Sequence, residues 1–136
     1  MQHIMTISEL AAAARDAQKN AYAPYSGFKV GAAVLTGSGN VFAGANVENA
    51  SFGLTICAER AAVAAAIGAG DTDLRVIAIA TDGNEPTVPC GACRQVLAEF
   101  NQSLEIVALT SSGKKQHFDL GELLPRVNQG ITVKHV

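Results

Sequence analysis

The stretch Leu74-Arg75-Val76-Ile77-Ala78-Ile79-Ala80 has the length of one β-strand and is apolar at every position except Arg75. An uninterrupted run of this kind is expected where a strand is buried on both faces of a sheet. A second run of the same character extends from Leu104 to Thr110. The two runs therefore predict two buried strands in a sheet that carries helices on both sides.

Helical segments surround these strands. Cys57 to Ala69 is predicted to form a helix that ends where glycines appear. Another helix is predicted from Pro89 to about Phe100, because proline is tolerated in the first turn of a helix. Near the N-terminus, Thr6 and Glu9 form a capping-box pattern that opens an Ala-rich helix reaching about Asn20.

The remaining elements complete an α/β fold. A hairpin, a short strand and a short helix are predicted at Phe28 to Thr36 with Val41 to Val47, at Gln116 to Phe118, and at Leu120 to Leu124. Strands that alternate with helices after an initial hairpin indicate a three-layer α/β/α arrangement with a mixed five-stranded sheet. We expect the 136 residues to form a single domain, 1–136.

The composition limits the kinds of molecule that this protein is expected to bind. The formal net charge is −2 and only 16% of residues are charged, so no basic field is available for a nucleic acid polymer. No apolar stretch reaches membrane-spanning length, and Met1 to Met5 lacks the pattern of a signal peptide. We therefore expect a small-molecule ligand, no membrane association and a cytoplasmic location.

The three cysteines form the strongest local pattern. Cys57 lies at one predicted helix start, and Cys90 with Cys93 lies at another, where the helix dipole favours thiolates. An odd number of cysteines, two of them one helical turn apart, suits metal ligation better than a disulfide framework. Catalytic zinc sites keep three protein ligands and leave the fourth position to water. The pattern predicts one such zinc per chain.

Charged neighbours of the cysteines suggest further roles. Glu59 is two residues beyond Cys57 and faces another way, so it is predicted to act as a general acid and base beside the metal's water rather than as a ligand. Zinc with three thiolates carries a charge of about −1, which disfavours ionisation of that water. Arg60 and Arg94 are predicted to offset this charge by donating hydrogen bonds to the thiolates.

Two motifs now stand together, Cys57-Ala58-Glu59-Arg60 and Pro89-Cys90-Gly91-Ala92-Cys93-Arg94-Gln95. With them, the chain resembles the cytidine deaminase family in its three-cysteine form, in which a zinc-activated hydroxide attacks C4 of cytosine. The resemblance covers nearly the whole chain, because Ala23 to Ala33 and Asn46 to Gly53 also resemble the family's substrate-binding segments.

The resemblance implies roles for individual residues. Phe28 would pack on the pyrimidine, Asn46 and Glu48 would bind a ribose hydroxyl, and Glu59 with a backbone group near Ala58 would contact the edge of the base. It also implies a homotetramer in which Ala50 to Phe52 completes a neighbouring subunit's site. The implied reaction is hydrolysis of cytidine, and of 2′-deoxycytidine, to the uridine product and ammonia, as in pyrimidine salvage.

The sequence departs from the family pattern at two positions. Phe52 stands where the family commonly has Tyr, which removes a hydroxyl group. Asn128 stands where the family's C-terminal Leu-Leu-Pro-x-x-Phe segment supplies an aromatic side chain over the bound base. The second departure predicts weaker binding of cytidine and greater tolerance of bulky bases, because stacking on a base is worth about 1–3 kcal/mol.

Other interpretations remain open at this point. The cysteines could be buried free thiols, or could hold a structural zinc with His117 as a fourth ligand. Glu59 could serve only as a charge at a helix N-terminus, and Phe28 could belong to the core. The competing functions are a deaminase of another aminopyrimidine nucleoside such as an antibiotic, a deaminase of DNA or RNA, and a non-catalytic zinc-stabilised binding module.

Overall fold

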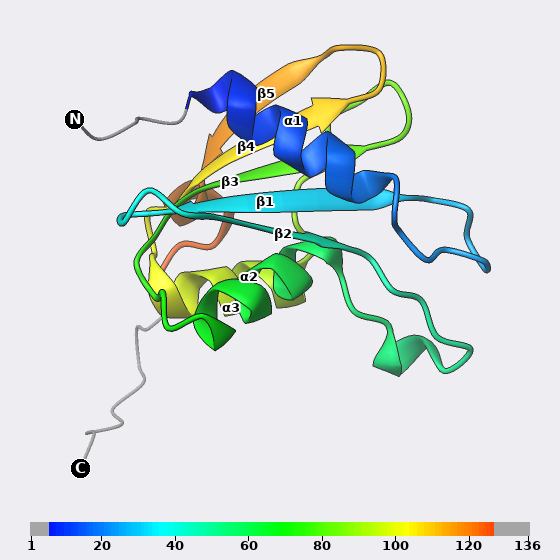
Figure 1. The fold of residues 1–136 in the computed structure, drawn as a ribbon, viewed down its shortest axis with the longest axis horizontal. Helices are drawn as coiled ribbons and strands as arrows, with labels where there is room; N and C mark the ends of the chain where they lie inside the picture. Colours follow the sequence, from blue (N-terminus) through cyan, green and yellow to red (C-terminus); the bar gives the residue numbers. More distant parts are fainter. Residues whose placement is uncertain (1–5, 127–136) are drawn as a thin grey trace.

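The computed structural model describes residues 6–126. Its elements follow the order α1 (Ile7–Gln18), β1 (Val30–Thr36), β2 (Val41–Ala45), the 3₁₀ helix η1 (Phe52–Leu54), α2 (Ala58–Gly68), β3 (Leu74–Thr81), α3 (Gly91–Phe100), β4 (Glu105–Thr110), β5 (Lys115–Asp119) and α4 (Leu120–Leu123). The predicted α/β fold is confirmed: one mixed sheet lies between α1 and the pair α2 and α3 (Figure 1). None of the described helices has the length and apolarity needed to cross a membrane.

Strand β3 lies at the centre of the sheet, whose order is β2-β1-β3-β4-β5. It pairs antiparallel with β1 and parallel with β4, so the sheet is mixed. Ile77 and Ile79 belong to the core beneath α2 and α3, whereas Ala78 and Ala80 belong to the core beneath α1. This alternation confirms that the apolar run is a strand buried on both faces.

The α1 face of the sheet includes the small residues Ala33, Ala78 and Ala80, which let the helix lie close to the central strands. At Gly31 in β1, an added Cβ atom would meet the Ala14 carbonyl oxygen of α1 at 2.1 Å. No side chain fits in that space, so the close approach of α1 to β1 requires glycine at this position.

The helix ends agree with the predictions apart from small shifts. Thr6 and Glu9 form the predicted capping box, and α1 ends at Gln18, two residues earlier than expected. Helix α3 begins at Gly91 with Cys90 as its N-cap, so Pro89 precedes the helix instead of occupying its first turn. The short helix η1 was not predicted, because three residues carry no periodicity that a sequence pattern can reveal.

Candidate metal centre and adjoining cavity

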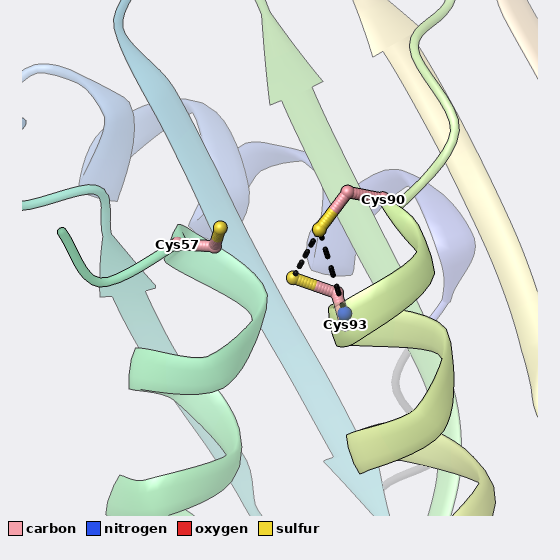
Figure 2. Close-up of side chains that lie close together, drawn as sticks. All are labelled: Cys57, Cys90 and Cys93. Carbon is pink, nitrogen blue, oxygen red and sulfur yellow. Dashed lines mark hydrogen bonds between the residues drawn. The ribbon is translucent and has the colours of Figure 1, made fainter. Parts of the chain in front are cut away.

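The three cysteines converge at the N-terminal ends of α2 and α3 (Figure 2). Cys57 is the N-cap of α2 and Cys90 is the N-cap of α3, while Cys93 lies in the first turn of α3. Their Sγ atoms all lie within 4.8 Å of one another, and those of Cys90 and Cys93 are 3.4 Å apart. The predicted grouping of the thiols is therefore confirmed.

The topology explains why the two helix starts meet. Helix α2 leads into β3, so its first residue lies near the end of β3 where the chain later departs towards Cys90. Helix α3 is the crossover from β3 to the parallel strand β4, and it begins beside the start of α2. Two helix N-termini with partial positive charge thus face the same group of thiols.

The pKa values of two of the thiols are shifted in opposite directions, that of Cys90 downward and that of Cys93 upward. Burial by itself would raise the pKa of the Cys90 thiol, but hydrogen bonds from the amide and thiol of Cys93 hold that pKa below its ordinary value. Burial raises the pKa of the Cys93 thiol, and the nearby carboxylate of Glu59 adds to the rise. A cation at this position would remove the cost of ionising Cys93.

The donor set fits a zinc ion. Two sulfurs bound to one tetrahedral zinc at about 2.3 Å stand roughly 3.8 Å apart, and the three sulfurs, all within 4.8 Å of one another, are grouped closely enough for this geometry. Among residues 6–126, the group of side chains able to hold a metal consists of the three cysteines and does not include His117. The His117 imidazole instead lies 3.0 Å from the Glu105 carboxylate on the β4–β5 pair. A structural site with His117 as fourth ligand is therefore excluded.

The two arginines differ in what they contact. Arg60 donates from Nη2 to the Sγ atom of Cys57 at 3.4 Å, as predicted. Its Nε atom is buried without a partner in the described part of the chain. Arg94 instead donates from Nε to the Pro89 carbonyl at 2.8 Å and from Nη1 to the Leu123 carbonyl at 3.0 Å. The prediction for Arg94 is wrong, because its hydrogen bonds go to two backbone carbonyls and tie the start of α3 to the end of α4.

Glu59 lies in the first turn of α2 and is only 6% exposed. Burial raises its pKa, although hydrogen bonds from its own amide and from Cys93 and the charge of Arg60 act in the opposite direction. A carboxyl group held above its ordinary pKa can exchange a proton with a substrate more readily near neutral pH.

A cavity of about 160 Å³ adjoins the cysteines. The predicted residues in its wall are Cys57, Ala58, Glu59 and Cys90. The residues that sequence reasoning missed are Val30, Ile79, Thr81, Thr87 and Val88. Val30 and Thr81 are register partners at the ends of β1 and β3, and Thr87 and Val88 directly precede Pro89. Their position next to Pro89 was the one local signal that could have nominated the last two.

The side chains of Asn46 and Glu48 hydrogen-bond to the backbone of residues 25–30, which lead into β1. Asn46 is 8% exposed, its Nδ2 donates to the Phe28 carbonyl at 2.9 Å, and its Oδ1 accepts from the Val30 amide at 2.9 Å. The Glu48 carboxylate accepts from the amides of Tyr25 and Ser26 at 2.9 and 3.1 Å. The Ser26 hydroxyl donates to the same carboxylate and, with these amides, lowers the pKa of Glu48 despite slight desolvation.

The aromatic candidates lie outside the cavity wall. Phe28 is 39% exposed and Phe52, in η1, is 78% exposed, and neither lines the 160 Å³ cavity. Ala50 is also exposed, in the loop before η1. Within this one chain, the segment from Ala50 to Phe52 is therefore not brought to the cysteines. Asn128 lies outside the described residues.

Comparison with known proteins gives a consistent result. The family model described as the cytidine and deoxycytidylate deaminase zinc-binding region matches residues 5–110. A cytidine deaminase from Halalkalibacterium halodurans is 49% identical over 110 residues, covering 80% of this chain and 83% of that protein. The crystal structure of a cytidine deaminase from Burkholderia pseudomallei superimposes with a TM-score of 0.86 at 48% identity, covering 89% of this chain and 98% of that one. One from Mycobacterium tuberculosis gives a TM-score of 0.78 at 42% identity, covering 89% and 95% of the two chains.

Proposed function

Because this chain belongs to the cytidine and deoxycytidylate deaminase family, we propose that it hydrolyses cytidine and 2′-deoxycytidine to uridine and 2′-deoxyuridine, with release of ammonia. The observation that carries the proposal is the 160 Å³ cavity that joins a buried carboxyl group to a three-thiol metal centre. The cavity is smaller than the roughly 300–1,000 Å³ typical of pockets for larger ligands, which favours a single pyrimidine ring.

The residues of the site divide the chemistry between them. Cys57, Cys90 and Cys93 would hold zinc, which supplies Lewis-acid activation of water. Glu59 takes one proton from the attacking water and passes it to the ring nitrogen beside C4 while the C4–O bond forms. It then takes the second proton from that oxygen and passes it to the amino group, so the C4–N bond breaks, ammonia leaves and the C4 carbonyl forms. The buried position of Glu59 supports this role, because exclusion of bulk water prevents the proton from being lost to solvent.

We assign substrate binding to Ala58 in the cavity wall and to three residues outside it, Phe28, Asn46 and Glu48. Phe28 packs against the base, Ala58 offers its backbone to the edge of the base, and Asn46 and Glu48 contact the sugar. A carboxylate has about four acceptor positions, and the Glu48 carboxylate already accepts three hydrogen bonds from Tyr25 and Ser26. One position remains, which suits a single sugar hydroxyl and supports the acceptance of both ribose and 2′-deoxyribose.

The assembly we propose is a homotetramer with shared sites. The large exposed apolar side chains of the described residues fall in two segments, 22–28 and 47–56, which we call the apolar loop surface: Tyr22, Tyr25, Phe28, Val47, Phe52, Leu54 and Ile56. A backbone bridge between Val47 and Tyr22 joins the two segments, and a bridge between Val47 and Ile56 connects the two ends of the second. Exposed apolar side chains gathered in two joined segments are typical of a subunit interface, and Ala50 to Phe52 would complete a neighbour's site there.

We also propose a cellular location and a metabolic role for the enzyme. Three thiols at a zinc site need a reducing compartment, which supports a cytoplasmic enzyme of pyrimidine salvage. The alternative is a deaminase of another aminopyrimidine nucleoside, such as a nucleoside antibiotic. Asn46 and Glu48 favour an ordinary ribose over a modified sugar.

The experiment that tests the proposal follows the loss of cytidine absorbance and the release of ammonia by the purified protein. We expect one zinc per chain and comparable turnover of cytidine and 2′-deoxycytidine. Removal of the metal with a chelator should abolish turnover, and added zinc should restore it. A zinc-loaded protein that leaves both nucleosides unchanged but deaminates a base-modified or sugar-modified analogue would establish the alternative.

A further inference from the structure

The hydroxyl group of Ser26 connects the side chain of Glu48, assigned to the sugar, with the backbone of Phe28, whose ring is assigned to the base. It donates to the Oε2 atom of Glu48 and accepts from the backbone amide of Phe28, which lies 3.0 Å away. Both hydrogen-bonding functions of the hydroxyl are therefore in use. The amides of Tyr25 and Ser26 fix the other carboxylate oxygen, Oε1, of Glu48.

The backbone of Phe28 is held at both of its peptide groups. Ser26 Oγ accepts from its amide, and Asn46 Nδ2 donates to its carbonyl at 2.9 Å. The residue as a whole stays 39% exposed. The main chain is thus fixed before any ligand binds, while the aromatic face remains available for contact.

The loop around Ser26 is a closed turn. The Gly27 amide donates to the Ala23 carbonyl at 2.9 Å, and Gly27 has a φ of 71°, a conformation that favours glycine. The exposed Ser26 lies in this turn, and its hydroxyl links the chain that leads to β1 with the chain that follows β2. Among residues 6–126, the Ser26 hydroxyl is the side-chain group that hydrogen-bonds both to Glu48 and to Phe28.

We propose that Ser26 is a positioning residue that sets Phe28 and Glu48 in register with each other, so that one nucleoside meets its base contact and its sugar contact together. The inference rests on the proposed function, because it assumes that Phe28 and Glu48 bind the nucleoside. Ser26 does not touch the reacting atoms. Its loss therefore weakens substrate binding and leaves the proton transfers at Glu59 unchanged.

The test compares Ser26→Ala with Ser26→Thr, which keeps the hydroxyl. Ser38→Ala is the matched control. Ser38 lies in the turn between β1 and β2, and its hydroxyl also donates to a carboxylate, that of Asp71, at 2.6 Å. Steady-state kinetics with cytidine and calorimetric binding of uridine are measured for each zinc-loaded protein, together with Tm. The uridine measurement reports binding independently of turnover.

We expect Ser26→Ala to raise KM for cytidine and Kd for uridine by about tenfold, with kcat almost unchanged. Ser26→Thr should restore most of the affinity, and Ser38→Ala should lower Tm without changing KM. A double substitution of Ser26→Ala with Glu48→Gln should cost less than the two single effects combined, because the residues act as a unit.

The possible failures are distinguishable. If the wild-type protein does not deaminate cytidine, the proposed function itself is contradicted. An active wild type with an unchanged KM and Kd in Ser26→Ala would overturn the role of Ser26 alone. A fall in kcat and Tm together, with KM unchanged, would show that the hydroxyl only stabilises the fold.

Discussion

Arg60 lies one helical turn after Cys57 and donates from Nη2 to its Sγ atom at 3.4 Å. This contact places a permanent positive charge against a thiol at the N-terminus of α2. The pKa of Arg60 is raised, first by the hydrogen bond to Cys57 and further by the charges of Cys57 and Cys93. The arginine therefore offsets part of the negative charge that three thiolates would bring to a zinc ion.

Replacement of Arg60 by Gln should move the pH–activity profile to higher pH. Loss of the cation leaves the site more anionic, which disfavours deprotonation of the attacking water, and we expect a shift of up to about one pH unit. Measurement of kcat/KM against pH checks this. Arg60→Lys, which keeps the charge, should shift the profile less. An unchanged profile in Arg60→Gln would mean that the two helix N-termini suffice.

Glu59→Gln should separate metal binding from catalysis. The substitution keeps the shape of a side chain that is 6% exposed but removes its ability to move protons, so zinc content stays at one per chain while turnover falls by at least about 10²-fold. Cys90→Ala, in contrast, should lose zinc and stability together. Metal analysis of both proteins decides the point, and loss of zinc from Glu59→Gln would contradict the assigned role.

Gly44→Ala should destabilise the packing of β2 on α2. An added Cβ atom would lie 2.5 Å from the Ala62 amide nitrogen and 2.7 Å from the Ala61 Cβ atom, so the helix would have to move. We expect a loss of roughly 1–3 kcal/mol in the free energy of unfolding. Gly68→Ala, at the end of α2 and outside the apolar loop surface, is the control, because beyond its own helix and chain neighbours nothing lies within 4 Å of the added Cβ atom. Denaturant unfolding of the two variants measures the difference.

Asp71 should stabilise the fold in a pH-dependent way. Hydrogen bonds from Ser38 and Thr36 lower its pKa, so its contribution is present above the unfolded pKa of about 3.9 and is lost as pH falls through the lower folded value. Asp71→Asn should therefore lower Tm at neutral pH, and the difference from wild type should shrink below about pH 4. Asp16→Asn, from an exposed pair with Lys19, should change Tm little at either pH.

The features that could be predicted from the sequence are those that depend on residue type and short-range spacing. The apolar run of β3 and the two cysteine-capped helix starts follow from residue type and spacing, and the structure has them where they were expected. Contacts between distant segments carry no such signal. Arg94 reaches Leu123 across 29 positions of sequence, and Val30 meets the cavity only because β1 pairs with β3 in one register.

The proposed sharing of sites between subunits predicts complementation between two defective variants. Phe52 is 78% exposed and lies away from its own chain's cavity, so Phe52→Ala should impair the neighbour's site and raise KM, while leaving its own Glu59 intact. A Glu59→Gln subunit has an inactive site of its own, but its Phe52 can still complete the site of a neighbouring subunit. In a mixed tetramer, the cavity of a Phe52→Ala subunit would receive a wild-type Phe52 from a Glu59→Gln neighbour.

The measurement is deamination at a cytidine concentration well below KM, after the two variants are unfolded together and refolded with zinc. We expect the mixture to exceed the summed activities of the separately refolded variants, since each mixed pair can form one site with both residues intact. Simple mixing without unfolding should give no gain if the tetramer exchanges subunits slowly. Strict additivity after co-refolding, or elution of active protein as a monomer, would show that each chain forms its site alone and that the apolar loop surface has another occupant.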